Sequence, residues 1–143
     1  MKKAKLLLYL ASLSIFIHFV GHVIGHSSWK TPKDANMQNV VNAMVENKAN
    51  YMGALRSLAD FYHGYSLILF VLYILSIWIL LVLVNNLRRN DLRLVKNILF
   101  PLGLAYTIFG IIEFYQFFPF AAIISTLAGL SIFGAMFFLR KTY

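Results

Sequence analysis

Four long apolar runs dominate the pattern of hydrophobic and polar residues along the chain. A membrane-spanning helix needs about 20 predominantly apolar residues to cross about 30 Å of hydrocarbon. The runs that meet this length cover approximately residues 6–26, 61–84, 98–117 and 118–139. The pattern therefore predicts an all-α fold, a bundle of four transmembrane helices that forms a single integral membrane domain over residues 1–143.

The connections between these runs differ in length. "NNLRRNDLR" and "QFFPF" are short, so the helices on either side of each should be antiparallel neighbours. The first connection is long, and after Pro32 its apolar residues recur with a near-helical period, at Met37, Val41, Met44, Tyr51, Met52 and Leu55. This period predicts an amphipathic extracytoplasmic helix on or just above the membrane surface, which either covers the bundle or forms a lid over a site.

The composition supports membrane insertion and excludes several kinds of chemistry. Of the 143 residues, 60% are hydrophobic and 13% are charged, whereas soluble domains have roughly 45–50% apolar and about 25% charged residues. The chain has no cysteine, which excludes disulfides, thiolate metal ligands and cysteine nucleophiles. The net charge of +8 comes without any nucleic-acid-binding motif. The expected partner is the lipid bilayer and not nucleic acid, and homo-oligomerisation is left open.

The basic residues beside the runs predict the orientation. One side of the membrane would carry nine of them, Lys2, Lys3, Lys5, Arg88, Arg89, Arg93, Lys96, Arg140 and Lys141, and the other side four, Lys30, Lys33, Lys48 and Arg56. Because cytoplasmic loops carry the excess of Lys and Arg, we expect a multi-pass protein of the cell (inner) membrane with both termini cytoplasmic. A cleaved signal peptide is the competing interpretation of the first run, although no A-x-A-like site follows it. Gly21 and Gly25 instead form a small-xxx-small pair suited to helix packing.

Three histidines, His18, His22 and His26, lie four residues apart in the first run. Each step of four residues turns a helix by only about 40° from the starting face, so the three side chains share one side. Ionisable groups inside a span are costly and normally face the bundle interior or a water-filled cavity. We therefore expect this histidine stripe to face other helices and not lipid.

Two other runs bring ionisable residues to the same depth. The second run opens with Asp60 and His63, and Glu113 lies close to the outer end of the third run. At a rise of 1.5 Å per residue, these side chains should approach His22 and His26 in the outer leaflet. Such a layer is a candidate functional site by default.

Three kinds of function are consistent with this layer. The first is binding of a metal ion by His22, His63 and Glu113, or of a b-type haem by His22 and His63. The second is an acid–base enzyme or a receptor for a small apolar ligand, with Glu113 and a histidine as the working pair. The third is a structural accessory subunit whose polar network is satisfied internally. His26 and His18 fit the structural interpretation better, and the sequence assigns no catalytic residue.

Two short motifs carry a family resemblance. "HFVGH" in the first run contains H-x-x-G-H, and "FYHGYS" early in the second fits F-x-x-G-[FY]-S. Together they resemble a group of small, uncharacterised four-span bacterial membrane proteins, a likeness that would cover most of the chain and implies no known activity. A looser similarity, to the emopamil-binding and sigma-2 receptor superfamily, rests on architecture alone, which is a weak warrant for function.

Overall fold

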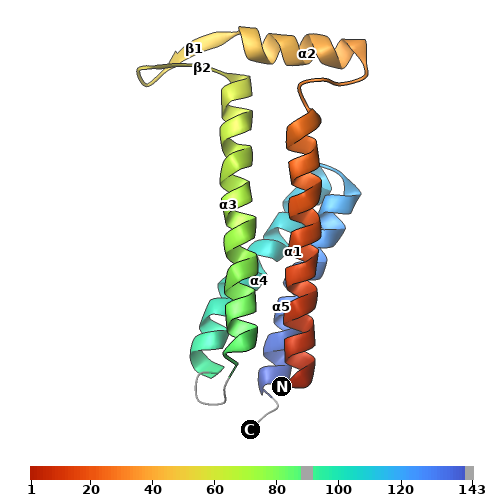
Figure 1. Ribbon diagram of the computed structural model, residues 1–143, viewed down its shortest axis with the longest axis vertical. Helices are drawn as coiled ribbons and strands as arrows, with labels where there is room; N and C mark the ends of the chain where they lie inside the picture. The colour runs from red at the N-terminus through yellow and green to blue at the C-terminus, as the bar shows by residue number, and fades with distance from the viewer. Residues whose placement is uncertain (88–91, 141–143) are drawn as a thin grey trace. The chain divides into compact units, whose positions relative to one another are not determined.

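The computed structural model describes residues 1–87 and 92–140 and confirms four helices long and apolar enough to span a membrane. They are α1 (Lys2–Ser28), α3 (Leu58–Asn85), α4 (Leu92–Gln116) and α5 (Pro119–Arg140) (Figure 1). A shorter helix, α2 (Ala35–Glu46), and a hairpin of strands β1 (Lys48–Tyr51) and β2 (Ala54–Ser57) connect α1 to α3. Three residues used for the predicted orientation, Arg88, Arg89 and Lys141, lie outside the described residues.

The helix predicted between the first two spans is confirmed for only part of its length. It begins after Asp34, whose carboxylate accepts a hydrogen bond from the Met37 backbone N–H at 2.9 Å, as expected of an N-cap. The helical period does not continue through the residues that form the hairpin, Tyr51, Met52 and Leu55. The chain turns back there because Gly53 adopts a φ of +90°, which glycine does at little cost. The extracytoplasmic position of α2 stays a prediction.

The chain forms two compact units. The first unit comprises residues 1–19 and 73–143 and contains the first part of α1, the second part of α3, and helices α4 and α5. The second unit comprises residues 20–72 and contains the end of α1, α2, the hairpin and the start of α3. Helices α1 and α3 therefore contribute to both units.

In the first unit, α4 and α5 run antiparallel and pack closely through glycine and threonine (Figure 1). A Cβ added to Gly110 would lie 3.0 Å from the backbone nitrogen of Thr126, and a Cβ added to Gly129 would lie 2.9 Å from that of Thr107. The contact is reciprocal, because both helices carry the same small-x-x-x-Thr-x-x-Gly pattern and each glycine faces the other helix's threonine. Glycine permits this close approach of two backbones, as in other membrane helix pairs.

The glycine pair of α1 does not make a contact of this kind. A Cβ added to Gly21 or Gly25 would meet no described atom within 4 Å. The helix-packing role expected for these two glycines is therefore wrong for the described residues. The physical reason is that α1 contacts α3 through rings, since His22 and His26 each pack edge-on against Phe70. Rings of this size keep the two backbones too far apart for a close glycine contact.

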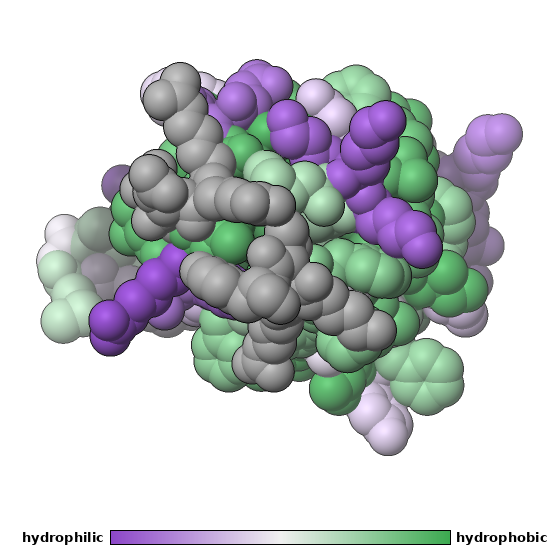
Figure 2. Space-filling model, turned by 90° about the horizontal axis from the view of Figure 1, so that it is seen from below, coloured by the Kyte–Doolittle hydropathy of each residue, from purple (hydrophilic) through white to green (hydrophobic). Residues whose placement is uncertain are grey.

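One end of the first unit gathers basic side chains. Helices α1 and α4 begin at this end, and α3 and α5 finish there (Figure 1). Seen from this end, hydrophilic side chains stand out among hydrophobic ones (Figure 2). The basic residues that the first turns of α1 and α4 bring here are Lys2, Lys3, Lys5, Arg93 and Lys96. Lysine and arginine collected at one end of a group of spans are the signal on which membrane orientation depends.

In the second unit, α2 and the hairpin lie crosswise over the ends of α1 and α3 (Figure 1). The hairpin pairs Lys48 with Ser57 at its base and Tyr51 with Ala54 beside its turn. Helices α1 and α3 have the length and composition of membrane spans.

Glycine-to-alanine substitutions should have different effects on stability in the close α4–α5 contact and on α1. Gly110→Ala and Gly129→Ala each place a methyl group against backbone atoms, so we expect either change to lower the free energy of unfolding by about 1–3 kcal/mol. Gly21→Ala is the matched control, because its new methyl group meets open space and alanine is the better helix former. Unfolding of the detergent-solubilised protein by SDS, followed by tryptophan fluorescence, measures the difference. Equal effects at Gly110 and Gly21 would contradict the close contact of α4 and α5.

Candidate functional site

The histidine stripe of α1 faces α3, as expected. The ring pairs between these helices, with the distances between ring centroids, are His18–Tyr73 (5.0 Å), His22–Phe70 (5.5 Å), His26–His63 (4.8 Å) and Trp29–Tyr62 (4.7 Å). From the first pair to the last, the residue numbers increase along α1 and decrease along α3, as expected of two antiparallel helices. The first pair lies in the first unit and the other three lie in the second.

His18 is the hub of a buried polar cluster in the first unit. We call the cluster the His18 centre, and it comprises His18, Tyr73, Glu113 and Ser125, one residue from each spanning helix. The Nδ1 atom of His18 lies 3.0 Å from Ser125 Oγ. Its Nε2 atom lies 3.2 Å from Tyr73 Oη and 3.4 Å from Glu113 Oε1. His18, Glu113 and Ser125 are only 8%, 9% and 1% exposed, so their hydrogen bonds depend on one another and not on bulk water.

The His18 centre can hold its protons in two arrangements. A neutral imidazole has one N–H donor and one acceptor nitrogen. With the proton on Nε2, His18 donates toward the Glu113 carboxylate and Nδ1 accepts from the Ser125 hydroxyl. With the proton on Nδ1, His18 donates to Ser125 Oγ, and Nε2 accepts from Tyr73 Oη or from a protonated Glu113. The two arrangements differ by one proton. From the second, a protonated Glu113 can pass its proton to Nε2, which forms an imidazolium that donates to the carboxylate and to Ser125 Oγ, so both ring nitrogens stay hydrogen-bonded during acid–base exchange.

Two buried oxygens at this place have no hydrogen-bond partner among the described residues. They are Glu113 Oε2 and Tyr106 Oη. Tyr106 is 1% exposed and precedes Glu113 by about two helical turns on the same face of α4. Ser76 lies near the phenol and Ser125 near the carboxyl, yet neither hydroxyl completes a hydrogen bond to these two oxygens. A buried polar atom left without a partner costs about 1–3 kcal/mol.

A second polar cluster lies in the second unit. We call it the Ser66 cluster, and it comprises His22, His26, His63 and Ser66. The Ser66 hydroxyl lies 2.8 Å from His26 Nδ1 and 3.1 Å from His22 Nε2. A hydroxyl has one proton to donate, so when it donates to one histidine, it must accept an N–H from the other. The tautomers of His22 and His26 are therefore coupled through a single buried serine.

His63, the third histidine of the Ser66 cluster, contacts His26 through its ring. The His63 ring is tilted by 33° against the His26 ring, with the ring centroids 4.8 Å apart, and the His63 side chain is exposed. The haem ligation predicted for His22 and His63 stays a prediction.

Asp60, the remaining candidate at this end of α3, has a structural role. Its Oδ2 accepts a hydrogen bond from the Ser57 backbone N–H at 2.9 Å, and its own backbone N–H donates to Ser57 Oγ at 3.2 Å. This reciprocal pair is the capping box that begins many helices. The sequence signal for this capping box is the spacing of Ser57 and Asp60 in "SLAD", so the capping role explains Asp60 without a functional site.

The predicted layer of site residues is divided between the two units. Glu113 pairs with His18 in the first unit, while His22, His26 and His63 gather in the second. The spans differ in where they end, since α1 continues for ten residues beyond His18 whereas α4 ends three residues beyond Glu113. The prediction assumed that all spans end at the same depth. Because α1 and α4 do not, the predicted depth of Glu113 relative to the α1 histidines is wrong by about seven residues, or two helical turns.

No metal-binding group is found in the part of the chain that the structure describes. Within residues 1–87 and 92–140, no three His, Asp or Glu side chains are placed to hold one metal ion. The metal assignment of His22, His63 and Glu113 combines residues of both units and stays a prediction. Sequence reasoning also missed two members of the His18 centre, Tyr73 and Ser125.

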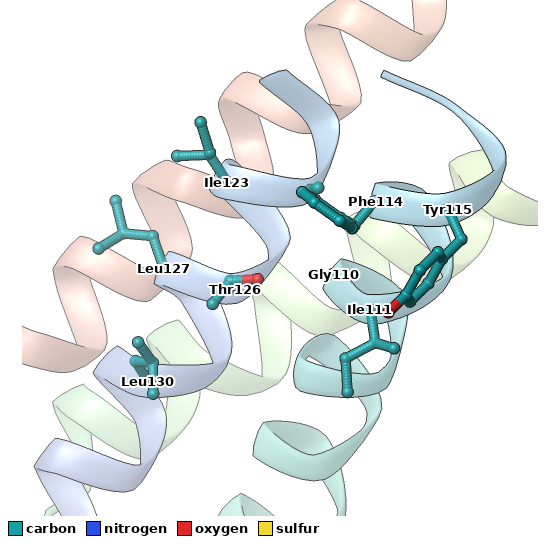
Figure 3. Close-up of a pocket in the computed structure, with 9 residues that line it drawn as sticks. Gly110, Ile111, Phe114, Tyr115, Ile123, Thr126, Leu127 and Leu130 are labelled. Atoms are coloured by element: carbon teal, nitrogen blue, oxygen red, sulfur yellow. The ribbon is translucent and has the colours of Figure 1, made fainter. Parts of the chain in front are cut away.

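An open apolar groove of about 740 Å³ lies along α4 and α5. Its walls are aliphatic and aromatic except for the hydroxyls of Thr126 and Tyr115 (Figure 3). None of the candidate site residues lines it. The groove does not explain the polar side chains of the spans.

Comparison of the chain with protein-family models, with curated proteins and with solved structures finds no match. The resemblance suggested by the H-x-x-G-H motif stays a prediction. The chemistry of the two clusters is therefore what bears on function.

Removal of the Ser66 hydroxyl should loosen both histidines that share it. We expect Ser66→Ala to lower the free energy of unfolding by about 1–2 kcal/mol, because two hydrogen bonds of roughly 0.5–1.5 kcal/mol each are lost. Ser27→Ala is the control, since that hydroxyl only donates to a carbonyl of its own helix, Val23 O at 2.8 Å. NMR of ¹⁵N-labelled histidine reports the tautomers directly. Unchanged His22 and His26 spectra in Ser66→Ala would show that the serine does not couple them.

Proposed function

We propose that this chain is a multi-pass membrane protein that binds a small, membrane-soluble molecule at the His18 centre. The molecule would be held by a polar head group that both donates and accepts hydrogen bonds. It would lie among residues contributed by all four spans, which is where membrane proteins place their functional ionisable groups.

The observation that supports this proposal is the pair of unpartnered oxygens. A purely structural network in an apolar interior is expected to satisfy its members, because lipid cannot supply the missing hydrogen bonds. Among residues 1–87 and 92–140, no donor reaches the carboxyl oxygen Glu113 Oε2 and no partner is hydrogen-bonded to the phenol of Tyr106. A ligand with two separated hydroxyl groups, such as a hydroquinone, could donate to the first with one hydroxyl and accept from the second with the other.

The tautomers of His18 add a chemical capability to this binding site. A bound hydroxyl that donates to Glu113 can lose its proton to the carboxyl, and the carboxyl can pass a proton to Nε2 of His18 at 3.4 Å. The proposal therefore includes acid–base exchange with the ligand, with Glu113 and His18 as the exchanging groups. Tyr73 and Ser125 would position the imidazole through their hydrogen bonds to it.

Substitution of Tyr106 should distinguish a ligand site from an incomplete structural network. If the phenol binds a ligand, Tyr106→Phe should lower the melting temperature of the protein in native lipid nanodiscs and remove a co-purifying small molecule from its native mass spectrum. If the phenol is unpartnered, the same change should leave the melting temperature equal or raise it, because a buried unsatisfied hydroxyl is removed. Tyr9→Phe, at an exposed tyrosine, is the matched control.

Substitution of Glu113 completes this test. Glu113→Gln keeps the size of the side chain and removes its proton exchange, so it should reduce ligand occupancy while the helical circular dichroism is retained. A lower melting temperature for Tyr106→Phe without any detectable ligand in the wild type would point to bound water and would overturn the proposal.

We also propose that both termini face the cytoplasm and that α2 lies outside the cell membrane. The support is the nine-to-four distribution of Lys and Arg and the gathering of basic residues at one end of the first unit. The chain lacks cysteine, so single cysteines report without background. Gln38→Cys should react with a membrane-impermeant maleimide in intact cells, and Asn86→Cys only after lysis. The reverse pattern would show the opposite orientation.

A further inference from the structure

The tip of the β1–β2 hairpin carries an apolar side chain at a place that disfavours it. Met52 and Gly53 occupy the turn with φ angles of +51° and +90°. Turns with two positive φ angles favour Asn or Gly, because a Cβ is crowded by the backbone in this conformation. Met52 is also fully exposed, at 107% of its reference area. The chain thus accepts backbone strain and an exposed thioether side chain at the same residue, which is the kind of outlier that points to a function.

The hairpin is held beside the first turn of a spanning helix. Strand β2 ends at Ser57, and α3 begins at the next residue. The Tyr51 ring packs edge-on against the Phe61 ring of α3, with the ring centroids 5.0 Å apart. Four strand residues extend only about 13 Å, and the head-group layer on each side of the hydrocarbon is roughly 5–7 Å thick. The tip is therefore restricted to the neighbourhood of the membrane boundary.

Basic and apolar side chains are exposed along the two strands of the hairpin. Lys48 and Arg56 are exposed on the two strands, and Leu55 is 61% exposed next to the turn. Both cations lie within electrostatic range of Asp60, but that carboxylate already accepts a hydrogen bond from the Ser57 backbone. Arg56 follows Leu55, Lys48 lies at the base of the hairpin, and exposed cations such as these are complementary to lipid phosphate groups.

We propose that the hairpin is a membrane-interface anchor. Met52 and Leu55 enter the boundary between head groups and acyl chains, and Lys48 and Arg56 bind lipid phosphates. The occupant is the bilayer around the protein's own spans, since the hairpin is tethered next to α3. The anchor would fix the position of α2 relative to the membrane surface, and it does not depend on the His18 centre or on which side of the membrane the hairpin lies.

The test uses the full-length chain in nanodiscs with an environment-sensitive dye. Met52→Cys is labelled with NBD, and Lys33→Cys, in the exposed segment before α2, is the water-facing control. We expect the Met52 label to emit at shorter wavelength than the control and to be quenched by nitroxides on the upper acyl chain. Emission and iodide quenching equal to those of the control would overturn the proposal, because the tip would then be exposed to water and not inserted in the bilayer.

A second measurement tests the charged part of the anchor. Raising the fraction of phosphatidylglycerol should shift the Met52 label further to shorter wavelength, and the double substitution Lys48→Gln and Arg56→Gln should abolish this shift. The conservative change Arg56→Lys, with Lys48 retained, should preserve it. A lipid dependence that survives the loss of both cations would remove the proposed phosphate contacts.

Discussion

An ionisable side chain inside a membrane span must find its partners on neighbouring spans, because lipid tails offer none. In this protein His18 meets that requirement with groups from the three other spanning helices, Tyr73, Glu113 and Ser125. Each of these bonds fixes the depth and rotation of one helix relative to α1. The arrangement of the first unit therefore depends on one buried imidazole as much as on apolar packing.

The spans approach one another in two different ways. Helices α4 and α5 touch through backbone, with glycine on one helix against threonine on the other. Helices α1 and α3 meet through imidazole, phenol and phenyl rings. Backbone contact leaves no room for a ligand, whereas a layer of rings can shift its rotamers to admit one.

The two clusters differ in the chemistry that they can support. The His18 centre joins an imidazole to a carboxyl group and is almost completely buried. The Ser66 cluster contains imidazoles and a hydroxyl, and its third histidine is exposed. A carboxyl is an acid–base partner that can take the proton itself, so the His18 centre is suited to exchange protons with a bound molecule. The Ser66 cluster can only redistribute protons between histidines unless water supplies them.

The sequence by itself determined the four spans, the short turns between the later ones and the shared face of His18, His22 and His26. These features depend on the length and period of apolar residues, which are local properties of the chain. It did not determine that Glu113 pairs with His18, because that pairing depends on where helices end relative to one another. Tyr73 and Ser125 were overlooked for the same reason, since a hydroxyl becomes part of a site only when the rotation of its helix turns it toward a partner. The hairpin also emerged only in three dimensions, because strand pairing joins residues that a helical period had assigned to one face.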